Sequence, residues 1–162
     1  MQNIRRLNAL RAQARASFYC CQCAASRVGD AQLREILGQS ASARWRLAQA
    51  IDVFLTSQPW EDHSRLASTL RDRLACLRRR LRALLVLDRD HHALRWLADD
   101  AAALRHAVEI CRGLSWSLEI SDLLTPRLED IKQAQRATME LEARLRERRG
   151  RGDRAQAPLA TA

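Results

Sequence analysis

The sequence predicts an all-α fold, a four-helix bundle with one long crossover between its second and third bundle helices. Apolar residues recur every three or four positions along most of the chain, which is the period of an amphipathic helix. The 162 residues include only 5 Gly and 3 Pro, and aromatic residues make up 4%. This composition favours helices, and the length fits one domain with a sizeable core, so collagen-like, disordered and disulfide-stapled classes are excluded.

The first two helices are expected at about residues 3–28 and 30–57. Gly29 can adopt the left-handed conformation that ends a helix, and Asp30 can cap the next one. Such a short turn predicts two antiparallel neighbours. The apolar seam of the first helix consists of Ile4, Leu7, Arg11, Ala14, Phe18, Cys21, Ala25 and Val28.

The crossover is expected to contain an additional helix at about residues 61–87, with leucines on one face and arginines on the other. Asp88 or Asp90 can cap the next bundle helix, which is expected at about 89–121. Its main seam continues through Leu94, Leu97, Ala101, Leu104, Val108 and Cys111.

The last bundle helix is expected at about residues 126–149, because Thr125 is a capping residue and Pro126 suits the first helical position. Residues 1–149 would then form a single bundle domain. Residues 150–162 lack periodicity and are expected to form a flexible tail rich in Arg, Gly and Ala.

The chain is strongly basic, with a formal net charge of +9 and an isoelectric point near 10.7. Residues 144–154 carry six arginines against two acidic residues, a density that could bind nucleic acid by counterion release. No aromatic residue interleaves these arginines, so a solvated helix end is the alternative. The candidate contacts are Arg144, Arg146, Arg148, Arg149, Arg151 and Arg154.

No apolar stretch has the length of a signal peptide or approaches the ~20 residues that span a bilayer. We therefore expect a cytoplasmic protein without a membrane partner.

Parts of residues 4–146 resemble an uncharacterised bacterial family of ferritin-like four-helix proteins, a domain-of-unknown-function group related to rubrerythrin. The resemblance implies a ferritin-like bundle with a long crossover. It rests mostly on expected core positions rather than on a catalytic motif. The residues that carry it are Leu7, Leu10, Phe18-Tyr19, Ala24-Ala25, Asp30-Ala31-Gln32-Leu33, Arg44, Leu47, Leu70-Arg71, Leu74, Leu77-Arg78, Leu81 and Asp90 through Leu94.

A di-iron centre of the ferritin-like type takes a Glu from each of two helices and a Glu-x-x-His pair from each of the other two. This chain has no such pair, and its first helix has no acidic residue. Where the resemblance would place a carboxylate near Tyr19, the chain has Ser17. We therefore expect no cofactor, no catalytic residue and no enzymatic activity.

The first helix carries Cys20, Cys21 and Cys23, and Cys111 lies on a later helix. Thiolates at i and i+3 could share a soft ion such as Cu(I) or Zn(II). The three cysteines do not share one helix face, however, and without a secretion signal they are better interpreted as reduced, buried thiols. A thiol metal or redox site is therefore the weaker hypothesis.

Arg11 and Arg44 interrupt apolar seams, and a buried guanidinium requires a partner. For Arg44 the hypothesis is an ion pair in the place of the lost metal site, with Glu142 or Asp99 as its partner. The alternative is that both arginines extend outward to solvent.

Trp45 and Trp116 lie off the main seams, where exposed tryptophans are typical of interfaces. The surface around one of them is predicted to join two copies of the chain. The sequence thus predicts a non-enzymatic interaction or scaffold protein with an unidentified protein partner. The alternatives are a basic nucleic-acid-associated stress protein and the thiol site on the first helix.

Overall fold

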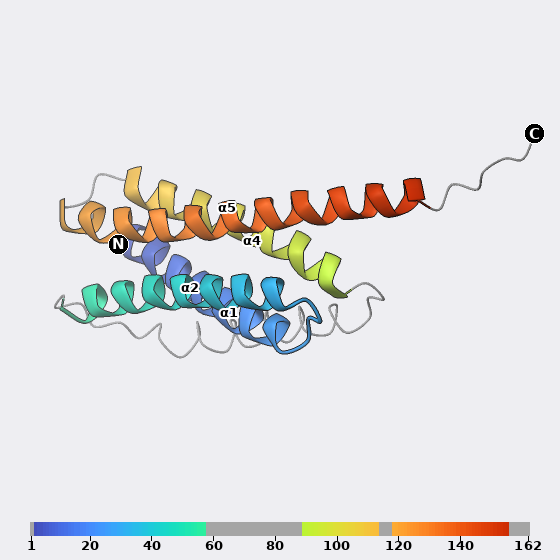
Figure 1. Ribbon diagram of the computed structural model, residues 1–162. Helices are drawn as coiled ribbons and strands as arrows, with labels where there is room; N and C mark the ends of the chain where they lie inside the picture. The colour runs from blue at the N-terminus through green and yellow to red at the C-terminus, as the bar shows by residue number, and fades with distance from the viewer. Residues whose placement is uncertain (1, 58–88, 114–117, 156–162) are drawn as a thin grey trace, which may run out of the picture.

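The computed structural model describes residues 2–57, 89–113 and 118–155 (Figure 1). These residues form four helices and contain no strand, which confirms the all-α prediction. The helices are α1 (Gln2–Ala25), α2 (Ala31–Ser57), α4 (Arg89–Gly113) and α5 (Leu118–Ala155). The additional helix predicted at 61–87 lies outside the described residues.

The four helices are arranged so that α1 packs on α2 and α4, and α5 packs on the same two helices. Each of these neighbouring pairs is antiparallel, whereas α2 and α4 run in the same direction across the diagonal of the bundle (Figure 1). Consequently α2 ends and α4 begins at opposite ends of the bundle.

The turn between α1 and α2 is held by two carboxylates. Asp30 caps α2 as predicted, because its Oδ1 accepts a hydrogen bond from the Leu33 N–H at 2.8 Å. The prediction of a left-handed conformation at Gly29 is wrong, since no glycine among the described residues has a positive φ. Instead the Gly29 and Asp30 N–H groups donate to the carboxylate of Asp90 at 3.0 and 3.1 Å. Asp90 thereby ties this turn to the first turn of α4.

The boundary between the last two helices differs from the prediction of helices at 89–121 and 126–149. The helix α4 ends at Gly113, and α5 already begins at Leu118. Pro126, expected at the first helical position, therefore lies inside α5.

Burial upstream of Pro126 explains this early start. Ile120 and Leu124 are buried in the same cluster as Leu128, so the apolar stripe of α5 begins before the proline. Burying two such side chains contributes about 3–6 kcal/mol, whereas a proline in a helix interior costs about 3 kcal/mol. The packing gain therefore outweighs the missing N–H.

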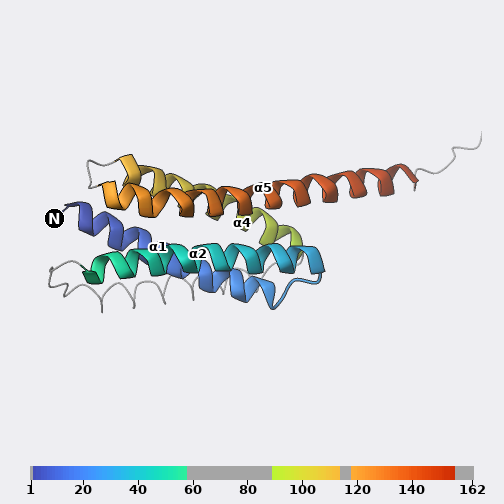
Figure 2. The same ribbon diagram turned by 60° about the vertical axis from the view of Figure 1, so that its left-hand side comes forward.

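The end of α5 also differs from the predicted end at residue 149, because helical backbone continues to Ala155. With 38 residues, α5 is about 57 Å long at 1.5 Å per residue. Its last turns project beyond the other three helices (Figure 2). Helical backbone thus includes residues 150–155 of the predicted tail, and the rest of that segment lies outside the described residues.

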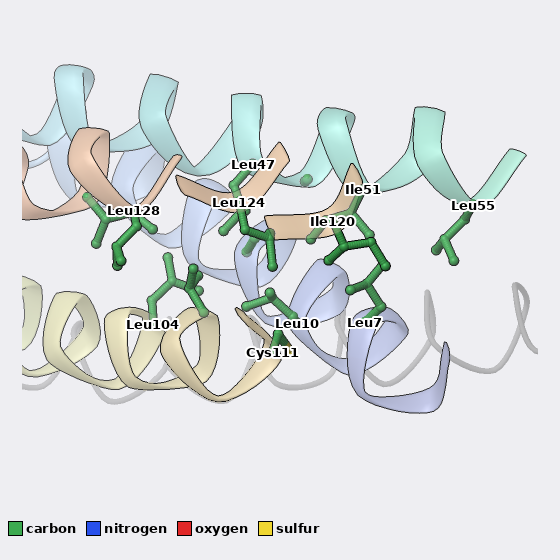
Figure 3. Close-up of a cluster of buried hydrophobic side chains, with 14 residues drawn as sticks. Leu7, Leu10, Leu47, Ile51, Leu55, Leu104, Cys111, Ile120, Leu124 and Leu128 are labelled. Carbon is green, nitrogen blue, oxygen red and sulfur yellow. The ribbon is translucent and has the colours of Figure 1, made fainter. Parts of the chain in front are cut away.

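The core is divided into two apolar clusters along the bundle. One cluster joins the start of α1 and α5 to the ends of α2 and α4, and its leucines point inward from all four helices (Figure 3). The other joins the end of α1, the starts of α2 and α4, and the middle of α5. Within the described ranges, no helix has the length and apolarity required to cross a membrane.

Candidate functional site: a buried polar layer

Buried polar side chains separate the two apolar clusters. Ser17 comes from α1, Ser40 and Arg44 from α2, and Asp100 from α4. We call these four residues the polar layer. On α5, Thr138 is also buried between members of the two clusters, but its hydroxyl donates to the Ala134 carbonyl of its own helix at 2.8 Å.

Arg44 is the centre of the polar layer and is fully buried. Its Nε and Nη2 donate to Asp100 Oδ2 at 3.1 and 3.0 Å, and Nη1 donates to the Ser40 carbonyl at 3.0 Å. Nε also donates to Ser17 Oγ at 2.5 Å, and that hydroxyl donates in turn to Asp100 Oδ2. The network therefore connects α1, α2 and α4 at one level of the bundle.

The energetic role of this pair follows from its burial. A buried ion pair is often no more stabilising than apolar side chains of the same volume, because both charges lose their hydration. Removing one partner is different, since it leaves an uncompensated buried charge at a cost of about 3–5 kcal/mol. The cost of breaking this pair therefore constrains how α2 and α4 are placed across the core of the bundle.

Cys21 lies one turn from Ser17 on α1. Burial raises the pKa of its thiol to about 12, although the positive charge of Arg44 opposes this shift. Burial also raises the pKa of Cys111, which lies in the other apolar cluster. Both thiols are thus protonated near neutral pH.

The structure does not bring the four candidate cysteines together. Cys20 is buried and Cys23 is partly exposed on α1, while Cys21 and Cys111 belong to different clusters. In the described parts of the chain, no group of three or more His, Cys, Asp or Glu side chains is placed to hold a metal ion.

The predicted ion pair of Arg44 has a different partner from the two proposed. Asp99 is exposed, and Glu142 accepts a hydrogen bond from Arg146 on its own helix. The partner is Asp100, because successive helical residues are rotated by about 100° and only one of two adjacent aspartates can face the core. The sequence does contain a signal for this choice. Asp100 follows Leu97 by three positions and precedes Leu104 by four, a spacing that places it on the same helix face as these two leucines.

Arg11, the other arginine in a seam, also forms an ion pair. Its Nη1 donates to Asp52 Oδ1 at 3.0 Å, and Arg15 donates to Asp52 Oδ2. The side chain of Arg11 is only 6% exposed, whereas that of Asp52 is 29% exposed. Arg11 therefore does not extend into solvent, and its pair lies at the edge of the α1–α2 contact.

The remaining predicted sites lie on the surface or outside the described residues. Trp45 is 37% exposed and packs on Phe18 with ring centroids 5.0 Å apart, whereas Trp116 lies in the undescribed segment. Arg144 and Arg146 are exposed on α5. The other candidate arginines, Arg148, Arg149, Arg151 and Arg154, lie in the helical turns that project from the bundle.

The polar layer does not fit a di-iron centre of the ferritin-like type. Asp100 is its only carboxylate, and Asp100 Oδ2 is already bonded to a guanidinium at 3.0 Å. A fixed positive charge at that distance repels metal cations.

The fold defines the class of this protein as an all-α bundle of antiparallel neighbours. Comparisons with protein-family models, with curated proteins and with solved structures found no match for the chain.

Proposed function

We propose that this protein is a non-enzymatic scaffold, a ferritin-like four-helix bundle in which an arginine–aspartate pair has replaced a metal site. The observation that carries the proposal is the fully buried Arg44 bonded to Asp100 between the two apolar clusters. In ferritin-like bundles with a metal centre, ligands from several helices bind the same ions and so hold the helices together. In this protein the charged network connects helices at the same level.

The helix arrangement supports the ferritin-like part of the proposal. Antiparallel neighbours, with α2 parallel to α4 across the diagonal, require a connection that returns the chain along the bundle. That is the topology of ferritin-like folds, which have one long crossover.

The side chains between the clusters support the non-enzymatic part. Ser17 is hydrogen-bonded to both Arg44 and Asp100, so its hydroxyl is engaged as donor and acceptor. The neighbouring Cys21 has a pKa of about 12 and is not a nucleophile at neutral pH. Neither Ser17 nor Cys21 is therefore an activated nucleophile.

Metal analysis of the protein purified from iron-supplemented cells tests this proposal. We expect far less than one equivalent of iron per chain, and no change in helix content after treatment with a chelator. Two iron atoms per wild-type chain would contradict the proposal.

A second candidate function is nucleic-acid association through the projecting end of α5. The observation that favours it is that the arginine-rich residues 144–154 continue as a helix beyond the bundle, where a polyanion can reach them. Arg146 is the most exposed of the described ion-paired cations, with its side chain 75% exposed.

Binding to random duplex DNA at several salt concentrations tests this candidate. Replacing Arg144, Arg146, Arg148 and Arg149 by Gln should weaken binding at least tenfold and flatten the salt dependence, because each phosphate contact contributes about −0.9 to the slope. The matched control replaces four exposed arginines elsewhere, Arg5, Arg6, Arg95 and Arg112, by Gln. Equal loss in both variants would contradict a specific role for α5.

A further inference from the structure

The side chain of Ser40 in the polar layer is buried in an environment that does not satisfy its hydroxyl. Ser40 is 0% exposed, and its Oγ has no hydrogen-bond partner among the described residues. A buried polar group without a partner is costly, because it has lost its hydrogen bonds to solvent. In folded proteins such groups are usually satisfied by another protein group or by an ordered water molecule. Ser40 therefore marks a place in the core where a further hydrogen-bonding group is expected.

Arg44, one turn further along α2, has donors left over at the same level. A guanidinium has five N–H donors in total. In Arg44, the Nε–H, one N–H of Nη1 and one N–H of Nη2 donate to described acceptors. The second N–H of Nη1 and the second N–H of Nη2 have no acceptor among the described residues, although the side chain is 0% exposed. The ion pair therefore does not use the full hydrogen-bonding capacity of Arg44.

The Ser40 hydroxyl and Nη1 of Arg44 lie beside the same peptide group. Nη1 donates to the Ser40 carbonyl oxygen at 3.0 Å, and the unpaired Oγ belongs to that same residue. Residues four apart on a helix also share one face. A molecule that bonds to two groups bridges a separation of up to about 6 Å, twice an ordinary hydrogen-bond length. One bridging molecule can therefore serve both groups.

A third polar group lies at this level on α5. Thr138 is 1% exposed and lies between the two apolar clusters, as Ser40 and Arg44 do on α2. Helices α2 and α5 pack against each other. The Thr138 hydroxyl donates to the Ala134 carbonyl of its own helix, but its oxygen can still accept a hydrogen bond.

The chemistry of these three groups specifies what can bind between them. Arg44 requires an acceptor, whereas the Thr138 oxygen requires a donor, so the bound molecule must do both. Asp100 already balances the charge of Arg44, so the molecule must also be neutral. Water meets these conditions, and a buried water typically makes about three hydrogen bonds to polar groups that are otherwise unsatisfied.

We propose that the polar layer binds one internal water molecule through Ser40, Arg44 and Thr138. The water accepts a hydrogen bond from Nη1 of Arg44 and donates one hydrogen to Ser40 Oγ and the other to Thr138 Oγ1. The network that joins α1, α2 and α4 is thereby extended to α5. Because the layer is buried, this water exchanges with bulk solvent only when the bundle opens. The proposal goes beyond the scaffold role and does not depend on it.

Relaxation dispersion of the ¹⁷O signal of water tests this site, because it detects long-lived internal water and does not respond to hydroxyl protons. Wild type is compared with Ser40→Val, which removes the hydroxyl and fills its surroundings with methyl groups. The dispersion should fall by the contribution of a single water molecule per chain. The matched control is Ser42→Val on the same helix, where the hydroxyl is exposed and bonded to the Gly38 carbonyl. This control should leave the dispersion unchanged.

A double-mutant cycle between Ser40→Ala and Thr138→Val gives a second readout without a larger side chain in the core. The two hydroxyls share no hydrogen bond among the described residues, so their effects on the unfolding equilibrium constant multiply unless a common molecule couples them. We expect the double variant to fall short of the product by at least about threefold. Three results overturn the proposal: no dispersion in wild type, equal dispersion in wild type and Ser40→Val, or effects that simply multiply.

Discussion

Arg44 and Arg11 both interrupt apolar seams, and the structure gives each a carboxylate, yet their surroundings differ. Arg44 and Asp100 are 0% and 5% exposed and bind each other between three helices. Asp52, the partner of Arg11, is 29% exposed and shared with Arg15 at the edge of α1 and α2. Water can replace Asp52 if the pair breaks, but it cannot reach Arg44 without opening the bundle.

This difference separates two uses of the same residue type. At the edge, the partner carboxylate is partly exposed, so solvent and salt reduce the energy of the ion pair. In the centre, an arginine makes correct helix pairing a condition for folding, since any other register leaves its charge unpaired.

The largest effect is expected from Asp100→Ala. This change leaves Arg44 buried without a counter-charge and should lower the free energy of unfolding by about 3–5 kcal/mol. Urea unfolding followed by circular dichroism measures it. A loss below about 1 kcal/mol would show that the buried Arg44–Asp100 pair contributes no more to stability than the Arg11–Asp52 pair at the edge.

A smaller effect is expected from Asp52→Ala, which breaks the pairs with Arg11 and Arg15 at the bundle edge. Asp52 is 29% and Arg15 34% exposed, so water can hydrate part of the remaining charge and the loss should be about 1–2 kcal/mol. It should also shrink as sodium chloride is raised from 0.05 to about 0.5 M. A loss as large as that of Asp100→Ala, unaffected by salt, would refute the comparison.

Because Cys21 is buried, the protein is predicted to lose stability at alkaline pH, where this thiol ionises in the unfolded chain first. Its folded pKa of about 12 lies above the ordinary value of 9.0, so its contribution is complete below pH 9 and is lost as the pH rises toward 12. Wild type should lose up to about 1.4 kcal/mol per pH unit more than Cys21→Ala between pH 9.5 and 11. Identical pH slopes would mean that water already reaches this thiol.

The smallest effects are expected at Asp99 and Glu142, the two carboxylates that the sequence suggested for Arg44. Asp99 is exposed, and the partner of Glu142 among the described residues is the exposed Arg146. Asp99→Asn and Glu142→Gln should each change the free energy of unfolding by less than about 0.5 kcal/mol. A larger loss in either variant would point to a contact with Arg44 after all.

Much of the fold could be predicted from the sequence because helix periodicity and the Asp30 cap are local signals. The start of α5 could not, because Thr125-Pro126 is a strong local start signal that the burial of Ile120 and Leu124 overrides. Likewise Gly29 suggested a left-handed turn, whereas Asp90, 61 positions away, holds that turn by hydrogen bonds.

For the candidate site, the sequence identified Arg44 as needing an ion pair but not which carboxylate supplies it. Asp99 and Asp100 are adjacent, so only the register between α2 and α4 decides which one faces Arg44. That register depends on packing between helices distant in sequence. Ser17 is a similar case, because a serine on an alanine-rich helix gives no sign of its partners across the bundle.

The central claim is that the Arg44–Asp100 pair holds the bundle in register, and a double-mutant cycle between these residues tests it most directly. Unfolding free energies are measured for wild type, Arg44→Met, Asp100→Leu and the double variant. Each single change should be strongly destabilising, whereas the double variant, with neither charge, should recover much of the loss and give a coupling energy of about 3 kcal/mol. A coupling energy below about 0.5 kcal/mol would contradict the claim.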